Sequence, residues 1–399
     1  MNSGRSICRT LGVVGIAIIL ATAFVPDVRA ADVRIAYLDR ANDPDYRIPL
    51  TYAGLYRKAK ASPYPAAELA IKDTAAAARA AGLDLVLEHK TLNEGEDAAA
   101  AIRDLLKTGP LVAAVLDLPL GEAEAAAKGL AKDGPLLINA RHREDELRVA
   151  ACRSRLLHVL PSWSMYMDAL AQGLLAAGWR DVLVLQGLEK EDRRVTSALF
   201  SSAKKFGLRI VATRDFVFGN DPRKRDQINV RLLTSKAEYD VVFVADESGD
   251  FARNVPYNTQ KPRPVVGAAG LMAHAWHPFW ERHGAPQLNR RFAKLAGRPM
   301  ADEDWATWVG VRMIATAIID SREQDGGRLM DALTGPTVRL ELYKGVPGSI
   351  RPWNRQLRQT MLLATHDAVI GAAPVEGALH RKNNLDTLGP DELEFRCPS

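Results

Sequence analysis

Predicted strands alternate with predicted helices along most of the chain, and this alternation constrains the fold more than any other feature. The first series consists of apolar runs of strand length and of segments with helical periodicity: strand 33–38, helix 66–81, strand 84–88, helix 98–106, strand 111–116, helix 121–132 and strand 136–138. Strands that alternate with helices pair in parallel and are covered by helices on both faces. The sequence therefore predicts an α/β fold built on a doubly wound parallel sheet.

The alternation restarts at a strand over 156–160, which indicates a second unit of the same kind. Its elements follow in the same order: helix 164–177, strand 181–186, helix 189–206, and further segments at 208–216, 226–236, 240–245 and 264–268. A chain of 399 residues is long enough for two α/β lobes and too long for one comfortable core. We therefore expect two doubly wound lobes of similar architecture, joined by a hinge.

The C-terminal part departs from this alternation. It contains predicted helices at 305–319 and 329–333 and predicted strands at 338–343 and 359–364, separated by Gly and Pro turns. We expect this part to return to the first lobe and to cover the hinge. The predicted domains are thus a first lobe at 31–158, a second lobe at 159–290 and a C-terminal segment at 291–399.

The first thirty residues have the features of a secretory signal peptide. Arg5 and Arg9 precede an apolar run over 11–24, and Val28 and Ala30 place small residues at the −3 and −1 positions of a cleavage site. We expect cleavage after Ala30 and a mature protein in the periplasm. The alternative is an uncleaved anchor, although the apolar run is short for a membrane span.

Two cysteines remain in the predicted mature chain. An even pair in an exported protein predicts a disulfide, here between Cys152 and Cys397. The alternative is two free thiols.

The charge distribution excludes one class of partner. The formal net charge is +5, and Lys and Arg are dispersed along the chain rather than gathered in a stripe. This pattern gives no indication of nucleic-acid binding. It is compatible with a small anionic ligand, provided that arginines converge on one site.

Three segments resemble one known family in order and spacing. Residues 32–38 (DVRIAYL) look like its opening strand, 64–71 (YPAAELAI) like its first helix, and 156–162 (LLHVLPS) like its crossover strand. The mature chain resembles the branched-chain amino-acid-binding proteins, which are type I periplasmic solute-binding proteins. The resemblance implies a monomer that captures a small molecule between two hinged lobes, works with a membrane ABC permease and is not an enzyme.

The loops depart from that family where it holds the amino acid. Its members carry Ser or Thr pairs after the third and fourth strands, whereas this chain has Asp117-Leu118-Pro119-Leu120 and Asn139-Ala140-Arg141-His142-Arg143. The family's Tyr-Gly pair in the second lobe is replaced by 188–192 (LEKED). These departures argue against an α-amino acid as the ligand.

A narrower resemblance rests on three loops: the long first loop (37–51), the Arg141-His142-Arg143 loop, and His274-Ala275-Trp276-His277-Pro278. Together they look like the branch associated with pyrroloquinoline quinone (PQQ) and its alcohol dehydrogenases. This resemblance implies PQQ as a bound ligand rather than a catalytic cofactor. It also implies delivery to a permease or to a PQQ-dependent dehydrogenase.

Ligands of open parallel sheets bind beyond the carboxyl ends of the strands, so the loops there supply the candidate binding residues. They are Arg40, Arg47, Arg141, His142, Arg143, Trp163, Trp276 and His277. Arginine forks bind carboxylates with two parallel bonds, and a Trp face stacks on a planar ring. Both properties suit a planar polycarboxylate such as PQQ. Solvated surface charges and core packing remain the alternatives for these side chains.

Signatures of catalysis and of metal binding are weak in this sequence. It has no Gly-x-Ser-x-Gly elbow, glycine-rich phosphate loop or zinc motif. His274 and His277 share a spacing of three residues, but no further ligands are close to them in the sequence. We expect a binding protein with no metal. A receptor for an amino acid or another small carboxylate, an exported enzyme and a sensor domain remain as alternatives.

Overall fold

The computed structural model describes residues 31–46, 60–130, 134–152, 154–217, 219 and 221–397. The predicted signal peptide, its cleavage site and Arg47 lie outside these residues.

The N-terminal half contains a five-stranded sheet, called here the first sheet, with the strand order β2-β1-β3-β4-β5. Its strands are β1 (Ala31–Arg40), β2 (Leu83–Leu92), β3 (Leu111–Asp117), β4 (Leu136–Asn139) and β5 (Leu156–His158), and all neighbours pair in parallel. The helices of this half are α1 (Tyr64–Ala80), α2 (Ala98–Lys107), α3 (Leu120–Gly129) and α4 (Asp145–Ala150). Every residue of β3 and β4 is buried, as expected for strands covered on both faces.

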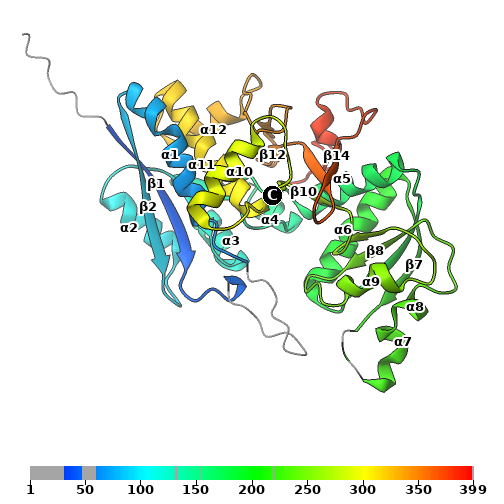
Figure 1. Cartoon of the computed structure of the whole chain (residues 1–399). Coiled ribbons are helices and arrows are strands. Elements are labelled where there is room, and N and C mark those ends of the chain that lie inside the picture. Colours follow the sequence, from blue (N-terminus) through cyan, green and yellow to red (C-terminus); the bar gives the residue numbers. More distant parts are fainter. Residues whose placement is uncertain are drawn as a thin grey trace, which may run out of the picture.

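A second parallel sheet follows, with the order β7-β6-β8-β9. Its strands are β6 (Asp181–Gln186), β7 (Arg209–Asp215), β8 (Val241–Ala245) and β9 (Val265–Gly267). The helices of this part are α5 (Trp163–Ala176), α6 (Lys190–Phe206), α7 (Arg225–Ile228), α8 (Val230–Leu233) and α9 (Val255–Asn258). Figure 1 shows the two sheets as separate lobes, with the C-terminal strands β12 and β14 between them. The predicted pair of parallel α/β lobes is therefore present.

After β9 the chain returns toward the first sheet. Helices α10 (Ala285–Ala296) and α11 (Asp302–Ser321) pack against α1, and α12 (Gly326–Thr334) packs against β4. Strands β10 (Met272–His274), β13 (Met361–Ala364) and β14 (Val369–Ala373) form a small antiparallel sheet, and β11 (Ser349–Ile350) pairs with β12 (Leu357–Arg358). The predicted boundary between the second lobe and the C-terminal segment, after residue 290, falls inside α10.

Local sequence explains where several helices begin and end. The hydroxyl of Ser162 accepts a hydrogen bond from the backbone N–H of Met165 and so caps α5. Gly207, with a φ of 76°, ends α6 in the left-handed region that favours glycine.

Two segments differ from the sequence prediction. The predicted strand at 338–343 is absent, because only Leu340 pairs there, through an isolated bridge to Gly348. The segment 226–236 forms two short helices, because Asn229 is extended and its side chain caps α8. Among the described residues, no helix is both long and apolar enough to cross a bilayer.

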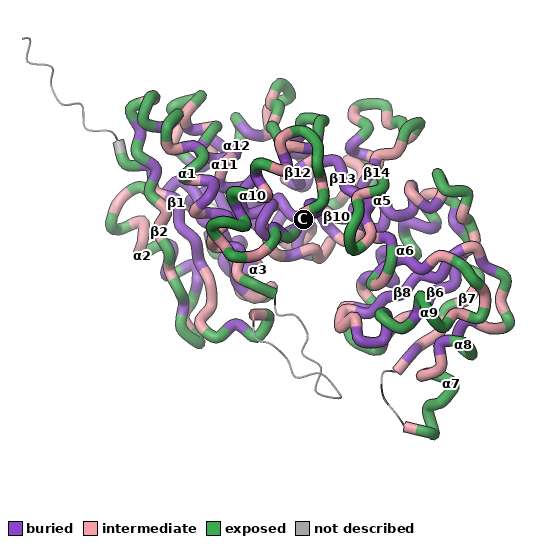
Figure 2. The backbone as a smooth tube through the Cα atoms, viewed as in Figure 1, coloured by how far each residue is buried: buried purple, intermediate pink, exposed green. Residues whose placement is uncertain are grey.

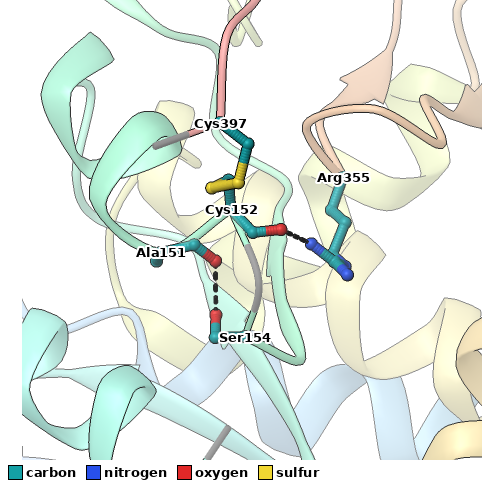
Figure 3. Close-up of a disulfide and its surroundings, with 5 residues drawn as sticks. All are labelled: Ala151, Cys152, Ser154, Arg355 and Cys397. Atoms are coloured by element: carbon teal, nitrogen blue, oxygen red, sulfur yellow. Dashed lines mark hydrogen bonds between the residues drawn. A yellow bond between two sulfur atoms is a disulfide. The ribbon is translucent and has the colours of Figure 1, made fainter. Parts of the chain in front are cut away.

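The predicted disulfide is present. Cys152 follows α4 and bonds to Cys397 in the C-terminal tail, with 5.9 Å between the Cα atoms. The guanidinium of Arg355 donates to the backbone carbonyl of Cys152 beside it (Figure 3). The buried residues of Figure 2 continue from each sheet into the region between the lobes, so the C-terminal segment shares the core of the molecule.

Candidate functional site

The carboxyl edges of the two parallel sheets face one another and form the candidate site. Glu144, in the loop after β4, lies 3.6 Å from Arg194 on α6. Lys60, before α1, lies 3.3 Å from Glu247, directly after β8. These two ion pairs join the first-sheet edge (the loops after β1, β3 and β4) to the second-sheet edge (the loops after β6 and β8 and the first turns of α6). Parallel sheets bind their ligands at such edges.

Arg141 is the centre of the first-sheet edge. Its guanidinium donates to both oxygens of Asp43, at 2.7 and 3.1 Å, and to Asp45 at 2.7 Å. A further bond of 3.2 Å reaches Asp117 at the end of β3. The Arg141 side chain is only 8% exposed. Burial by itself lowers the pKa of Arg141, but the bonds to Asp43 and its other acidic partners raise that pKa above its ordinary value.

Two tyrosines complete the surroundings of Asp117. Tyr37 of β1 donates its hydroxyl to Asp117 at 2.6 Å, and Tyr46 donates to the other carboxylate oxygen. Burial raises the pKa of Asp117, while the charge of Arg141 opposes that rise. Burial, followed by the Asp117 charge, raises the pKa of Tyr37 well above its usual value, so this hydroxyl stays protonated. Asp117 was not among the predicted site residues, although it is the first polar residue after the apolar run 111–116.

Arg40, at the end of β1, holds neighbouring loops together. Its guanidinium donates to Glu122 of α3 at 3.0 Å through Nε, and to the carbonyl of Glu96 at 3.0 Å. The predicted ligand-binding arginines Arg40 and Arg141 are therefore both paired with carboxylates of the chain itself. Any anionic ligand that they bind must compete with these partners.

His142 and Glu144 follow Arg141. The ring Nε2 of His142 lies 2.7 Å from the carbonyl oxygen of Leu118, and its Nδ1 lies 3.7 Å from Glu144. Burial lowers the pKa of His142, and the charge of Glu144 opposes this effect. Glu144 in turn reaches Arg194, so this short loop connects the two sheet edges.

Arg143 and Trp163 lie together at the crossover between the lobes. The Arg143 guanidinium stands over the rings of Trp163 and Tyr166, at 5.5 and 5.3 Å from their centroids. It also pairs with Glu303 at 2.8 Å and lies 3.7 Å from Asp302. The Arg143 side chain is 17% exposed and Trp163 is half-buried. Of the predicted site residues, these two combine a cation with an accessible aromatic ring.

Trp276 and His277 lie in the interior. Trp276 is 1% exposed, its ring stacks on Trp305 at 5.9 Å, and its Nε1 donates to Asn289 at 2.8 Å. His277 is buried beside Phe279 and His274, and its pKa is lowered by burial and then by the His274 charge. In this conformation neither ring presents a face to the sheet edges.

The second-sheet edge is rich in carboxylates. Asp192 accepts hydrogen bonds from the backbone N–H groups of Glu247 and Glu189, at 2.7 and 3.2 Å. A Cβ on Gly187 would lie 2.1 Å from Asp192 Oδ2, so a larger residue here would displace this carboxylate. Burial raises the pKa of Asp192, opposed by the bond from Glu247. Acidic groups were not among the predicted site residues here.

The described residues hold no group of three or more His, Cys, Asp or Glu side chains that could bind a metal ion. The two edges offer cationic hydrogen-bond donors and anionic acceptors around the half-buried indole of Trp163. This arrangement suits the binding of a small polar organic molecule.

No protein-family model and no curated protein matches this sequence. Solved structures do match the fold. A periplasmic binding protein from Burkholderia mallei aligns with a TM-score of 0.64 and 12% identity, over 92% of this chain and 99% of its own. A branched chain amino acid ABC transporter periplasmic ligand-binding protein from Burkholderia xenovorans aligns with a TM-score of 0.65 and 14% identity, over 85% and 95% of the two chains.

A third match is a solute binding protein of an ABC transporter from Rhodopseudomonas palustris in complex with 3,4-dihydroxybenzoic acid. It aligns with a TM-score of 0.58 and 16% identity, over 86% of this chain and 94% of its own. At these identities the likeness establishes the architecture. The chain has the two-lobed α/β fold of type I periplasmic binding proteins, and the predicted fold class is confirmed.

Proposed function

We propose that this protein is an exported solute-binding protein of an ABC-transporter-like system, which binds a small molecule between the two sheet edges without transforming it. The observation that carries the proposal is the pairing of those edges through Glu144–Arg194 and Lys60–Glu247. The three structural neighbours carry names of binding proteins, and two are ABC-transporter components, which supports the same role here. Export rests on the signal-peptide pattern of residues 1–30.

For the ligand we propose PQQ or a related planar polycarboxylate. The resemblance of the loops suggests this class. Arg143 supports it as a charged donor beside the half-buried ring of Trp163, although a ligand would share this guanidinium with Glu303. Charge-assisted bonds from an arginine to a carboxylate are about twice as strong as neutral hydrogen bonds. Delivery to a membrane permease or to a PQQ-dependent dehydrogenase, by a protein that acts as a monomer, belongs to the same proposal.

A second ligand class is an amino acid or a smaller carboxylate. It is favoured by one observation: Arg40 and Arg141 already bind Glu122, Asp43 and Asp45, so fewer cationic groups are free for a tricarboxylate. The neighbours named for branched-chain amino acids and bound to 3,4-dihydroxybenzoic acid support this class too.

Isothermal titration calorimetry of the purified mature protein distinguishes the two classes. PQQ, leucine and 3,4-dihydroxybenzoate are titrated separately, and the recovered ligand is checked for chemical change. We expect saturable one-to-one binding of unchanged PQQ. Tight leucine binding with no heat from micromolar PQQ would replace the first ligand class by the second.

The variant Arg143→Gln locates the binding site. Loss of a buried charged partner costs roughly 2–5 kcal/mol, which lowers PQQ affinity more than tenfold. The matched control is Arg223→Gln, which removes an exposed arginine of the second lobe. Equal affinities for both variants would place the ligand elsewhere.

A further inference from the structure

Two segments of the chain, called here the crossing segments, pass side by side between the lobes. The first, 158–163, leads from β5 to α5, and the second, 355–361, passes through β12 to β13. They share one isolated backbone bridge, between His158 and Gln356. The side chain of Gln356 adds two bonds, because it donates to the carbonyls of His158 and Leu160 at 2.9 and 3.2 Å. A side chain therefore does much of the work of a strand ladder here.

The loop after β4, called here the site loop (140–144), runs along the first crossing segment. The backbone N–H of Val159 donates to the carbonyl of Asn139, just before the loop, at 2.9 Å. The backbone N–H of Trp163 donates to the carbonyl of Arg143, inside the loop, at 2.8 Å. The loop that carries Arg143 is thus bonded at both ends to the chain that crosses between the lobes.

Arg148 of α4 joins the site loop to both crossing segments. Its Nη1 donates to the carbonyls of His142 and Glu144, at 2.8 and 3.0 Å. Its Nη2 donates to the carbonyl of Leu160 at 2.7 Å, and its Nε donates to the side-chain oxygen of Gln356 at 3.1 Å. The residue is only 3% exposed. One buried guanidinium therefore contacts three segments that belong to different parts of the chain.

The chemistry of the guanidinium makes these contacts directional. Burial lowers the pKa of Arg148 to about 10, and the charges of Asp145 and Glu144 oppose this effect. The group therefore remains charged at neutral pH, and its hydrogen bonds are stronger than those of a neutral donor. Because the guanidinium is planar and rigid, its donors point in fixed directions. A shift of one bonded segment then strains the bonds to the other two.

We propose that Arg148 is a positioning residue that couples the closure of the two lobes to the placement of the site loop. The inference rests on the proposed function, in which a solute binds between the sheet edges. Arg148 acts through the loop, which carries Arg143 and also Glu144, the residue that reaches Arg194 in the second lobe. A solute that needs this loop in place binds one arrangement of the crossing segments better than another, and so shifts the population toward closure.

Hydrogen exchange of the ligand-free mature protein tests the coupling whatever the solute is. Backbone N–H groups at 141–147 should exchange faster in Gln356→Met, because Arg148 has lost its bond to the second crossing segment. They should exchange faster again in Arg148→Gln. In the double variant the added effect of Gln356→Met on 141–147 should fall by more than about half, since Arg148 no longer transmits it. Fully additive effects, or unchanged exchange at 141–147 in Gln356→Met, would overturn the inference.

Arg155→Gln is the matched control for a purely structural arginine. Arg155 is partly buried and donates to the carbonyl of Gly134 at 2.6 Å, within the first lobe. Both variants should lower the melting temperature. The affinity for PQQ, or for whichever of the three titrated solutes binds, should fall roughly fivefold or more in Arg148→Gln and less than about twofold in Arg155→Gln.

The outcomes separate this inference from the proposed function. Equal affinities of Arg148→Gln and Arg155→Gln for a solute that the wild type binds would contradict the coupling and leave the binding function intact. A wild type that binds none of the three solutes would count against the proposed ligands, and the exchange measurement would still decide the role of Arg148. If Arg148→Gln does not fold, Gln356→Met alone gives that answer.

Discussion

Arg141 and Asp43 are joined by two parallel hydrogen bonds of 2.7 and 3.1 Å, and both side chains are almost completely buried. This pair ties the loop after β4 to the loop after β1. The guanidinium of Arg141, at the centre of the first-sheet edge, is therefore bound by a carboxylate of the protein itself.

Asp43→Asn should destabilise the protein by about 3 kcal/mol. Removing one partner of a buried ion pair usually costs 3–5 kcal/mol, and the remaining bonds from Arg141 to Asp45 and Asp117 keep the value at the low end. Urea unfolding followed by circular dichroism measures the change. Asp45→Asn is the control, because Asp45 is about half-exposed and should contribute less than about 1 kcal/mol. Similar losses of unfolding free energy in Asp43→Asn and Asp45→Asn would contradict the larger contribution assigned to the buried Arg141–Asp43 pair.

The double variant Cys152→Ser with Cys397→Ser should unfold more easily than the wild type. The bond closes a loop across 245 residues of sequence, and the chain-entropy model gives a stabilisation on the order of 5 kcal/mol for such loops. A reductant should lower the melting temperature of the wild type and leave the double variant unchanged. Two reactive thiols in the unreduced native protein would show that the bond does not form.

Acidification from pH 7 to pH 5 should destabilise the fold through His158. Burial, and then the charge of Arg148, lowers the pKa of His158 well below 6.5. The unfolded chain therefore takes up a proton near pH 6.5 that the folded chain refuses. Stability falls as the pH drops below 6.5, by up to about 1.4 kcal/mol per pH unit for one group, until the folded pKa is reached.

The variant His158→Gln should weaken this pH dependence, because glutamine does not titrate. Unfolding free energies at pH 5, 6 and 7 provide the comparison. The exposed-face variant His366→Gln serves as control, since the side chain of His366 is open to solvent. The same change of unfolding free energy with pH in the wild type and in His158→Gln would exclude His158 as the source of the pH dependence.

Gly187→Ala should disrupt the second-sheet edge. The added Cβ would meet Asp192 Oδ2 at 2.1 Å and push this carboxylate away from the N–H groups of Glu189 and Glu247. Overpacking of this kind costs roughly 1–3 kcal/mol. Gly121→Ala, inside α3 with open space at its Cβ, should be neutral or stabilising by up to about 1 kcal/mol. Differential scanning calorimetry of the two variants tests whether the space beside Gly187 is too small for a Cβ.

The sequence predicts most of the fold because hydrophobic periodicity is a local property. The runs at 111–116 and 182–185 are strands because they are apolar throughout, and both lie inside parallel sheets. The helix α10 and the strand β14 were not predicted. β14 alternates only partly in burial and pairs antiparallel with β13, a partner that its own residues do not specify.

The site is less predictable because the state of a charged group depends on residues far away in the chain. The position of Arg141 after a strand places it at the correct sheet edge. Its three carboxylate partners come from the end of β3 and from the segment after β1, one of them 98 positions away, and nothing local to Arg141 identifies them. Trp276 lies in a loop by sequence, yet Trp305 of α11 covers its ring. The types of side chain in the candidate site were thus predictable from the sequence, whereas the partners and the burial of these side chains were not.

The interior position of Trp276, Trp305 and Trp308 gives the molecule a usable optical property. All three indoles are shielded from water, so they emit at short wavelength as long as the fold is intact. Trp163 is half-buried beside the Arg143 guanidinium and emits from a more polar environment. A spectrum of the wild type minus that of Trp163→Phe therefore isolates one reporter at the sheet edges. Because Trp179, Trp280 and Trp353 are also partly exposed, only this difference spectrum, and not the red edge of the wild-type spectrum, reports on Trp163.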